Sequence, residues 1–165
     1  MTEETDTDDP VMDRITAAIE QGHAGDPTGA RAGLEALWEE VGADGDPFHR
    51  VVLAHFAADV QDDPASELAW DERALAAAEE VTDERAQQYH ASLAVAGFYP
   101  SLHLNLADVH RRLGDLDAAR RHVAAARERL PDLPDDGYGA MIRAGFERVS
   151  ALVEAGDTAA ASVET

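Results

Sequence analysis

The 165-residue sequence carries a formal net charge of −21 at pH 7, and all 13 of its positively charged side chains are arginine. It has no cysteine, which excludes disulfides, thiol nucleophiles and Cys-ligated zinc. A field this negative repels nucleic-acid phosphates and anionic lipid heads, and it attracts basic partners. We therefore expect neither a nucleic-acid nor a membrane partner, although the acidity also fits a compositional habit of the genome or adaptation to salt.

The hydrophobic fraction of 45% suffices for one domain with a core, and the low aromatic fraction of 5% favours packed helices over sheets. The first nine residues, MTEETDTDD, lack the basic and apolar regions of a signal peptide. No segment approaches the ~18 consecutive apolar residues of a membrane span. The sequence predicts one domain over residues 10–155, disordered tails at 1–9 and 156–165, and a cytoplasmic location.

Asp-Pro pairs mark the expected helix starts in the first half of the chain. An Asp accepts hydrogen bonds from free N–H groups of a first helical turn, and a following Pro has a preset φ and no N–H to satisfy. The pairs are Asp9-Pro10, Asp26-Pro27, Asp46-Pro47 and Asp63-Pro64. The spacing from Pro10 to Pro47 is 37 residues, and so is that from Pro27 to Pro64, so two helices recur as one repeating unit.

Apolar residues at three- and four-residue spacing predict one buried stripe on each helix. In the first two segments these are Val11, Ile15, Ala18, Ile19, then Ala30, Leu34, Leu37, Trp38 and Val41. After Val81 the 37-residue period is interrupted by roughly the length of one helix, so we expect an extra helix over about 83–95. Further helices over 102–113, 116–130 and 138–155 bring the total to about seven or eight in an all-α fold.

The segment from His103 to Pro131 reads HLNLADVHRRLGDLDAARRHVAAARERLP. Its informative positions are Asn105-Leu106-Ala107, Gly114-Asp115 at a turn, Ala119 and Ala126 in the second helix, and Pro131 at the end. On these residues the segment resembles a tetratricopeptide (TPR) repeat, with histidines at 103 and 110 where the family usually has large aromatics. We expect Gly114 to end the first helix in the left-handed conformation and Asp115 to cap the second.

The resemblance implies a right-handed stack of antiparallel helix hairpins, an α-α superhelix whose concave face holds a peptide or protein segment. On the family's pattern, Leu104, Asp108, Arg111 and Arg112 point toward that face, and the two arginines would bind carboxylates of the segment. The chain from 108 to 129 carries six arginines and four acids, so it is a basic region in an acidic protein. The alternative is that these arginines pair with acids on neighbouring helices.

The sequence contains no phosphate-binding loop, nucleophile elbow or helix-borne His-Glu-His pattern. None of its seven histidines pairs with another at ligand spacing, since His103 and His110 are two turns or ~10.5 Å apart. We therefore expect a protein-binding adaptor or scaffold with no enzymatic activity, catalytic residue, cofactor or metal. Two alternatives stay open: a self-associating structural domain, for instance a homodimer in a regulatory assembly, and a small-molecule-binding or catalytic bundle using His49, His55 or His90.

Overall fold

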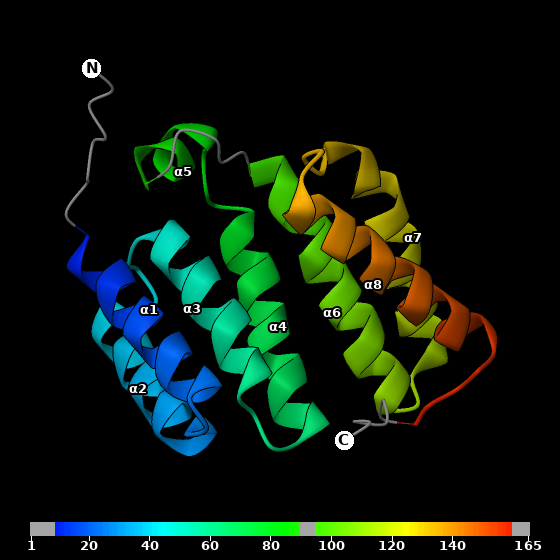
Figure 1. Cartoon of the computed structure of the whole chain (residues 1–165), viewed down its shortest axis with the longest axis horizontal. Coiled ribbons are helices and arrows are strands. Elements are labelled where there is room, and N and C mark those ends of the chain that lie inside the picture. Colours follow the sequence, from blue (N-terminus) through cyan, green and yellow to red (C-terminus); the bar gives the residue numbers. More distant parts are fainter. Residues whose placement is uncertain (1–8, 90–94, 160–165) are drawn as a thin grey trace.

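A computed structural model describes residues 9–89 and 95–159, which form eight α-helices and two short 3-10 helices (Figure 1). The elements are α1 (Pro10–His23), α2 (Pro27–Val41), α3 (Pro47–Asp59), α4 (Pro64–Ala78), α5 (Asp83–Tyr89), η1 (Val95–Phe98), α6 (Tyr99–Arg112), α7 (Leu116–Arg129), η2 (Leu130–Asp132) and α8 (Gly137–Glu154). All regular structure in these residues is helical, which confirms the expected all-α class. No helix in the described ranges has the length and apolarity needed to cross a membrane.

The predicted helix starts are confirmed. At the four Asp-Pro pairs, the Asp side chain accepts a hydrogen bond from a backbone N–H of the first turn, and the Pro is the first residue of the helix. The predicted turn between α6 and α7 is also confirmed. There Gly114 has φ of +85°, and Asp115 accepts from the N–H of Ala118 at 3.1 Å.

The predicted extra helix, over about 83–95, is described in part. The described part of it is α5, which ends at Tyr89, and residues 90–94 lie outside the described residues. The next helix begins earlier than expected, at Tyr99 rather than at Leu102, because Pro100 occupies the first turn of α6. Proline is tolerated there since the N–H groups of a first turn have no partner within the helix.

The predicted tails fall mostly outside the described residues, which begin at Asp9 and end at Ala159. The first residues of the predicted C-terminal tail are held in place, because Arg111 donates hydrogen bonds to the carbonyls of Asp157 and Ala159 at 2.8 and 2.6 Å. This part of the tail therefore packs on the end of α6.

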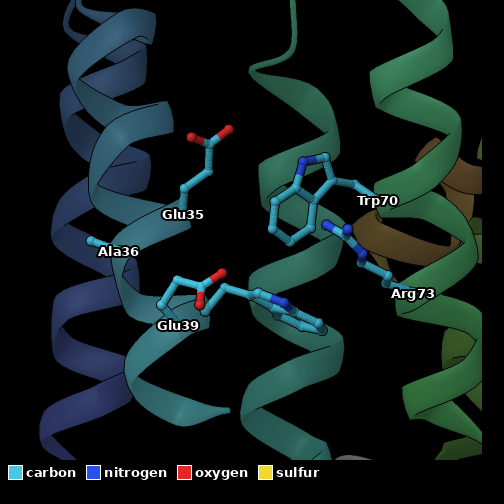
Figure 2. Close-up of a pocket in the computed structure, with 6 residues that line it drawn as sticks. Glu35, Ala36, Glu39, Trp70 and Arg73 are labelled. Carbon is cyan, nitrogen blue, oxygen red and sulfur yellow. The ribbon is translucent and has the colours of Figure 1, made fainter. Parts of the chain in front are cut away.

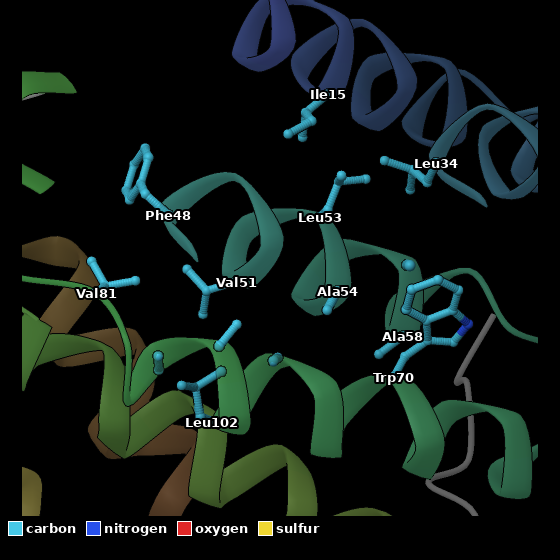
Figure 3. Packing of buried hydrophobic residues seen from close by; sticks show 14 of the residues in the cluster. Ile15, Leu34, Phe48, Val51, Leu53, Ala54, Ala58, Trp70, Val81 and Leu102 are labelled. Carbon is cyan, nitrogen blue, oxygen red and sulfur yellow. The ribbon is translucent and has the colours of Figure 1, made fainter. Parts of the chain in front are cut away.

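Helices that follow one another along the chain pack as antiparallel pairs, α1 with α2, α3 with α4, and α6 with α7 (Figure 1). Each pair packs on the next, since α2 contacts α3, α4 contacts α6, and α7 contacts α8. The α3 helix is buried on two sides. Figure 3 shows Leu53 pointing toward Ile15 and Leu34, while Val51 and Ala54 point to the opposite side of α3. Leu102 lies across from Val51.

Two small residues of the TPR-like segment are buried where helices meet. Ala107 on α6 and Ala119 on α7 are both 0% exposed. They belong to a second apolar cluster that includes Phe146 and Val149 of α8. The core therefore has two parts, one centred on α3 and one between α6, α7 and α8.

Candidate functional site

A small cavity lies between α3, η1, α6 and the start of α8, and we call it the α3–α6 pocket. It encloses about 180 Å³ and is lined mainly by apolar side chains. These include Val51, Val52, Phe56, Phe98 and Leu102. Three polar side chains, His55, Ser101 and Tyr138, complete its wall. A cavity of this composition binds apolar groups and orients them with a few hydrogen bonds.

The imidazole of His55 lines the pocket and also contacts a polar side chain of α6. Its Nδ1 lies 3.4 Å from the side-chain nitrogen of Asn105 on α6. Burial lowers the pKa of His55, and the nearby carboxylate of Asp59, one turn further along α3, opposes this effect. His55 is therefore neutral at pH 7 and presents a hydrogen-bonding ring without a charge.

The two hydroxyl groups of the pocket bond to each other. Tyr138 Oη donates to Ser101 Oγ at 3.4 Å, and Ser101 Oγ donates to the backbone carbonyl of Phe98 at 3.0 Å. A serine nucleophile needs a base that accepts its proton. The proton of Ser101 goes to a carbonyl oxygen instead, so this arrangement supports binding rather than acyl transfer.

Acidic side chains gather at the contact between α4 and α6. Arg112 donates to Glu67 at 2.7 Å and to Asp108 at 3.0 Å. Asp71 lies among them, 2% exposed, and one of its carboxylate oxygens has no hydrogen-bond partner. Burial, reinforced by the charges of Glu67 and Asp59 and opposed by Arg112, raises the pKa of Asp71 to about 8. Asp71 is thus protonated at neutral pH, but it is too enclosed to reach a substrate.

Of the four predicted partner-binding residues, Leu104 and Arg111 are buried, whereas Asp108 and Arg112 are half-buried. Leu104 is 8% exposed and packs in the cluster with α8. Arg111 is 0% exposed, and its guanidinium donates to Asp108 as well as to the C-terminal carbonyls. Arg112 donates a hydrogen bond to Glu67 on α4. This agrees with the alternative prediction, in which these arginines pair with acids on neighbouring helices. The structure brings Asp108, Arg111 and Arg112 together, but as an intramolecular network.

Sequence reasoning missed the pocket because its residues come from separate elements. On α6, Ser101 and Leu102 line the pocket, and Asn105 contacts His55. The face of α6 that the sequence predicts to bind a partner starts at Leu104 instead. A signal was present in the sequence. A histidine within the apolar stripe of α3 and an asparagine at a buried face of α6 are polar groups that need partners.

Three histidines form a stack on α6 and α7 that helix spacing alone could not reveal. The ring of His122, from α7, lies 5.4 Å from that of His103 and 5.4 Å from that of His110. The Nδ1 atoms of His103 and His122 are 3.1 Å apart. Burial and the neighbouring imidazoles lower the pKa of His122 to about 4. Among the residues that the structure describes, no three potential ligands gather in a metal-binding arrangement.

His49 connects three helices instead of lining the α3–α6 pocket. Its Nε2 lies 2.8 Å from the carboxylate of Asp9 and 3.3 Å from Arg85, which itself donates to Asp46 at 2.7 Å. These contacts join the starts of α1 and α3 to α5. His90, the third histidine of the small-molecule alternative, lies outside the described residues.

We compared the chain with known proteins. No family model, curated protein or solved structure matches it. The TPR resemblance stays a prediction.

Proposed function

We propose that this chain is a protein-binding module made of stacked helix hairpins in a TPR-like superhelix. In this proposal an apolar side chain of the partner segment inserts into the α3–α6 pocket. The observation that carries it is the pocket itself, which combines apolar walls with three hydrogen-bonding side chains. No step of the proposal needs a cofactor or a reaction.

The order of helix packing supports a hairpin stack. In such a stack the second helix of each pair packs on the first helix of the next. The contacts of α2 with α3, α4 with α6 and α7 with α8 follow that order, and α8 then serves as the closing helix. The α3–α6 pocket is lined by α3, α6 and α8, which are first helices of successive units. In the TPR family this is the side that holds a bound segment.

The size of the pocket favours one side chain over a whole small molecule. Pockets for small ligands typically enclose ~300–1,000 Å³. The α3–α6 pocket, at about 180 Å³, suits a single large aliphatic or aromatic side chain. The net charge of −21 favours a partner segment that carries basic residues beside this apolar anchor.

The α5 helix does not close the pocket in the described residues, because it packs at the start of α3. Its Tyr89 ring lies 5.5 Å from that of Phe48, and Arg85 pairs with Asp46. The residues that line the pocket come from α3, η1, α6 and α8. The described part of the extra helix is thus compatible with an accessible groove.

The proposal is tested with synthetic peptides that carry one Phe or Leu anchor between lysines, measured by fluorescence anisotropy. Tyr138→Ala removes one wall of the pocket, and Tyr138 is 43% exposed, so the fold should persist. We expect binding to weaken about tenfold, as for truncation of an aromatic anchor. Met141→Ala is the matched control, because Met141 lies on α8, is 61% exposed and does not line the pocket.

Equal affinities for the two variants would refute the pocket as the binding site. Sedimentation velocity separates partner binding from self-association. A wild-type dimer that Tyr138→Ala dissociates would assign the pocket to a second copy of the chain, and the adaptor proposal would then be wrong.

A further inference from the structure

A second cavity, between α2 and α4, contains both tryptophans of the chain (Figure 2). It has a volume of about 380 Å³. The rings of Trp38 and Trp70 are 5.3 Å apart and nearly perpendicular, at 84°. Two ring faces therefore meet at a corner, and we call this cavity the Trp38–Trp70 pocket.

Two carboxylates line the same pocket. Glu35 and Glu39 stand one turn apart on α2 and reach toward the side where Trp70 and Arg73 lie (Figure 2). Both side chains are exposed, and within the described residues neither forms an ion pair. The adjacent Glu40, by contrast, pairs with Arg14 at 2.6 Å. The pocket thus combines aromatic faces with two carboxylates that form no ion pair in the described part of the chain, and the guanidinium of Arg73 lines the same pocket.

Two arginine side chains of the protein already lie over these rings, and the guanidinium carbon of Arg50 is 5.5 Å from the centre of the Trp38 ring. The guanidinium carbon of Arg73 lies 4.4 Å from the centre of the Trp70 ring and 5.7 Å from that of Trp38. Cations over tryptophan faces at such distances are attracted by the ring quadrupole. Arg73 is exposed and has no carboxylate partner in the described part of the chain, so it is free to swing into solvent.

The geometry of the corner discriminates between types of cation. A planar guanidinium stacks on one ring, as Arg73 does most closely on Trp70. A tetrahedral ammonium with methyl groups contacts two perpendicular faces at once, and methylation lowers the cost of removing it from water. Glu35 and Glu39 supply the balancing negative charge.

We propose that the Trp38–Trp70 pocket binds a methylated ammonium group, which takes the place of Arg73 in the ring corner. Two sources carry this chemistry: a free solute of the choline type and a methylated lysine side chain. The proposal does not depend on the proposed protein-binding function, because the two pockets share no lining residue.

The test is a titration of the full chain with tetramethylammonium chloride, followed by ¹H–¹⁵N NMR. The sequence has two tryptophans and both line this pocket, so the side-chain indole N–H signals report on it alone. We expect saturable shifts of both signals. Sodium chloride at equal ionic strength serves as the reference, because an electrostatic effect of salt would shift them without saturation.

The Arg73→Gln variant provides the sharpest criterion. It removes the Arg73 guanidinium and its positive charge from the two rings, while the Arg50 guanidinium stays beside Trp38. We therefore expect tetramethylammonium to bind about two- to fivefold more tightly than to the wild type. Glu39→Gln should weaken binding by a similar factor. Glu72→Gln, a change of equal charge on the exposed surface of α4, is the matched control and should leave the dissociation constant unchanged. Far-UV circular dichroism checks that each variant is folded.

Absence of saturable shifts in both the wild type and Arg73→Gln would overturn the proposal, as would weaker binding to Arg73→Gln. Once binding is established, choline is compared with a trimethyllysine peptide and its unmodified lysine form. Tighter binding of the modified peptide assigns the site to a methylated protein, and tighter binding of choline assigns it to a free solute. Equal binding of the unmodified peptide would contradict recognition of the methyl groups.

Discussion

The two contacts that α4 makes with its neighbouring helices differ in chemistry. Toward α3, the buried residues are mainly alanines, including Ala54, Ala57 and Ala74, each 0% exposed. Toward α6, the contact contains Asp71 and the Glu67–Arg112 pair. The first contact is held by close approach of two helices through small side chains, and the second by half-buried charged side chains around the buried Asp71. Helices of one stack can therefore respond very differently to substitution and to pH.

Breaking the charged contact should have the largest effect. Arg112→Met keeps most of the length of the side chain but leaves Glu67 and Asp108 without the cation they share. Both acids lie near the buried carboxyl of Asp71. Because the pair is half-buried, we expect a loss of about 2–4 kcal/mol in the free energy of unfolding, measured by urea denaturation. Arg120→Met is the control, since the pair with Asp117 is exposed and contributes ~1 kcal/mol or less. If Arg112→Met and Arg120→Met lost similar amounts of stability, the larger role assigned to the Arg112 contact would be wrong.

The raised pKa of Asp71 makes the stability of the charged contact depend on pH. The folded-state value of about 8 lies above the ordinary value of 3.8, so the folded protein holds a proton that the unfolded chain releases. The stabilisation that the protonated Asp71 provides is full below pH ~4 and is lost as pH rises through 8. The free energy of unfolding falls by up to about 1.4 kcal/mol for each pH unit in this range. Asp71→Asn should remove this dependence of stability on pH, because the amide does not titrate.

We therefore expect the variant to gain stability over the wild type as pH rises from 5 to 8. Urea denaturation at a series of pH values measures the difference between the two proteins. A constant difference across that range would show that Asp71 keeps an ordinary pKa.

Overpacking the alanine contact should have the smallest of the three effects. Ala74→Leu inserts a larger side chain where α3 and α4 approach closely, at a cost of about 1–3 kcal/mol. Ala76→Leu makes the same change at an exposed position of α4 and should cost little. In contrast to Asp71→Asn, the effect of Ala74→Leu should not vary with pH, which the same denaturation series checks.

Local signals in the sequence were sufficient for most of the helix starts. The Asp-Pro pairs and Gly114-Asp115 each act within one turn of backbone, so they could be interpreted without the fold. The start of α6 was placed too late, because Pro100 is equally compatible with a break and with a first helical turn. The extra helix was inferred from a length difference, and its described part ends at Tyr89.

The candidate site required contacts that the sequence does not encode locally. The expected face of α6 included Leu104 and Arg111, because the TPR resemblance assigns positions by register. In the structure Arg111 is buried against the C-terminal segment, which lies 46 residues further along the chain. The histidine stack was missed for the same reason, since His122 enters it from a different helix.

By itself, the sequence determined that this protein is helical, where most of its helices begin, and that its net charge is strongly negative. Those properties follow from hydrogen bonds within one turn, from apolar periodicity and from summed charge. Only the tertiary structure decided which polar groups are buried together and where cavities remain. Burial, pKa and cavity shape depend on side chains from helices far apart in the chain, such as α2 with α4 and α3 with α6.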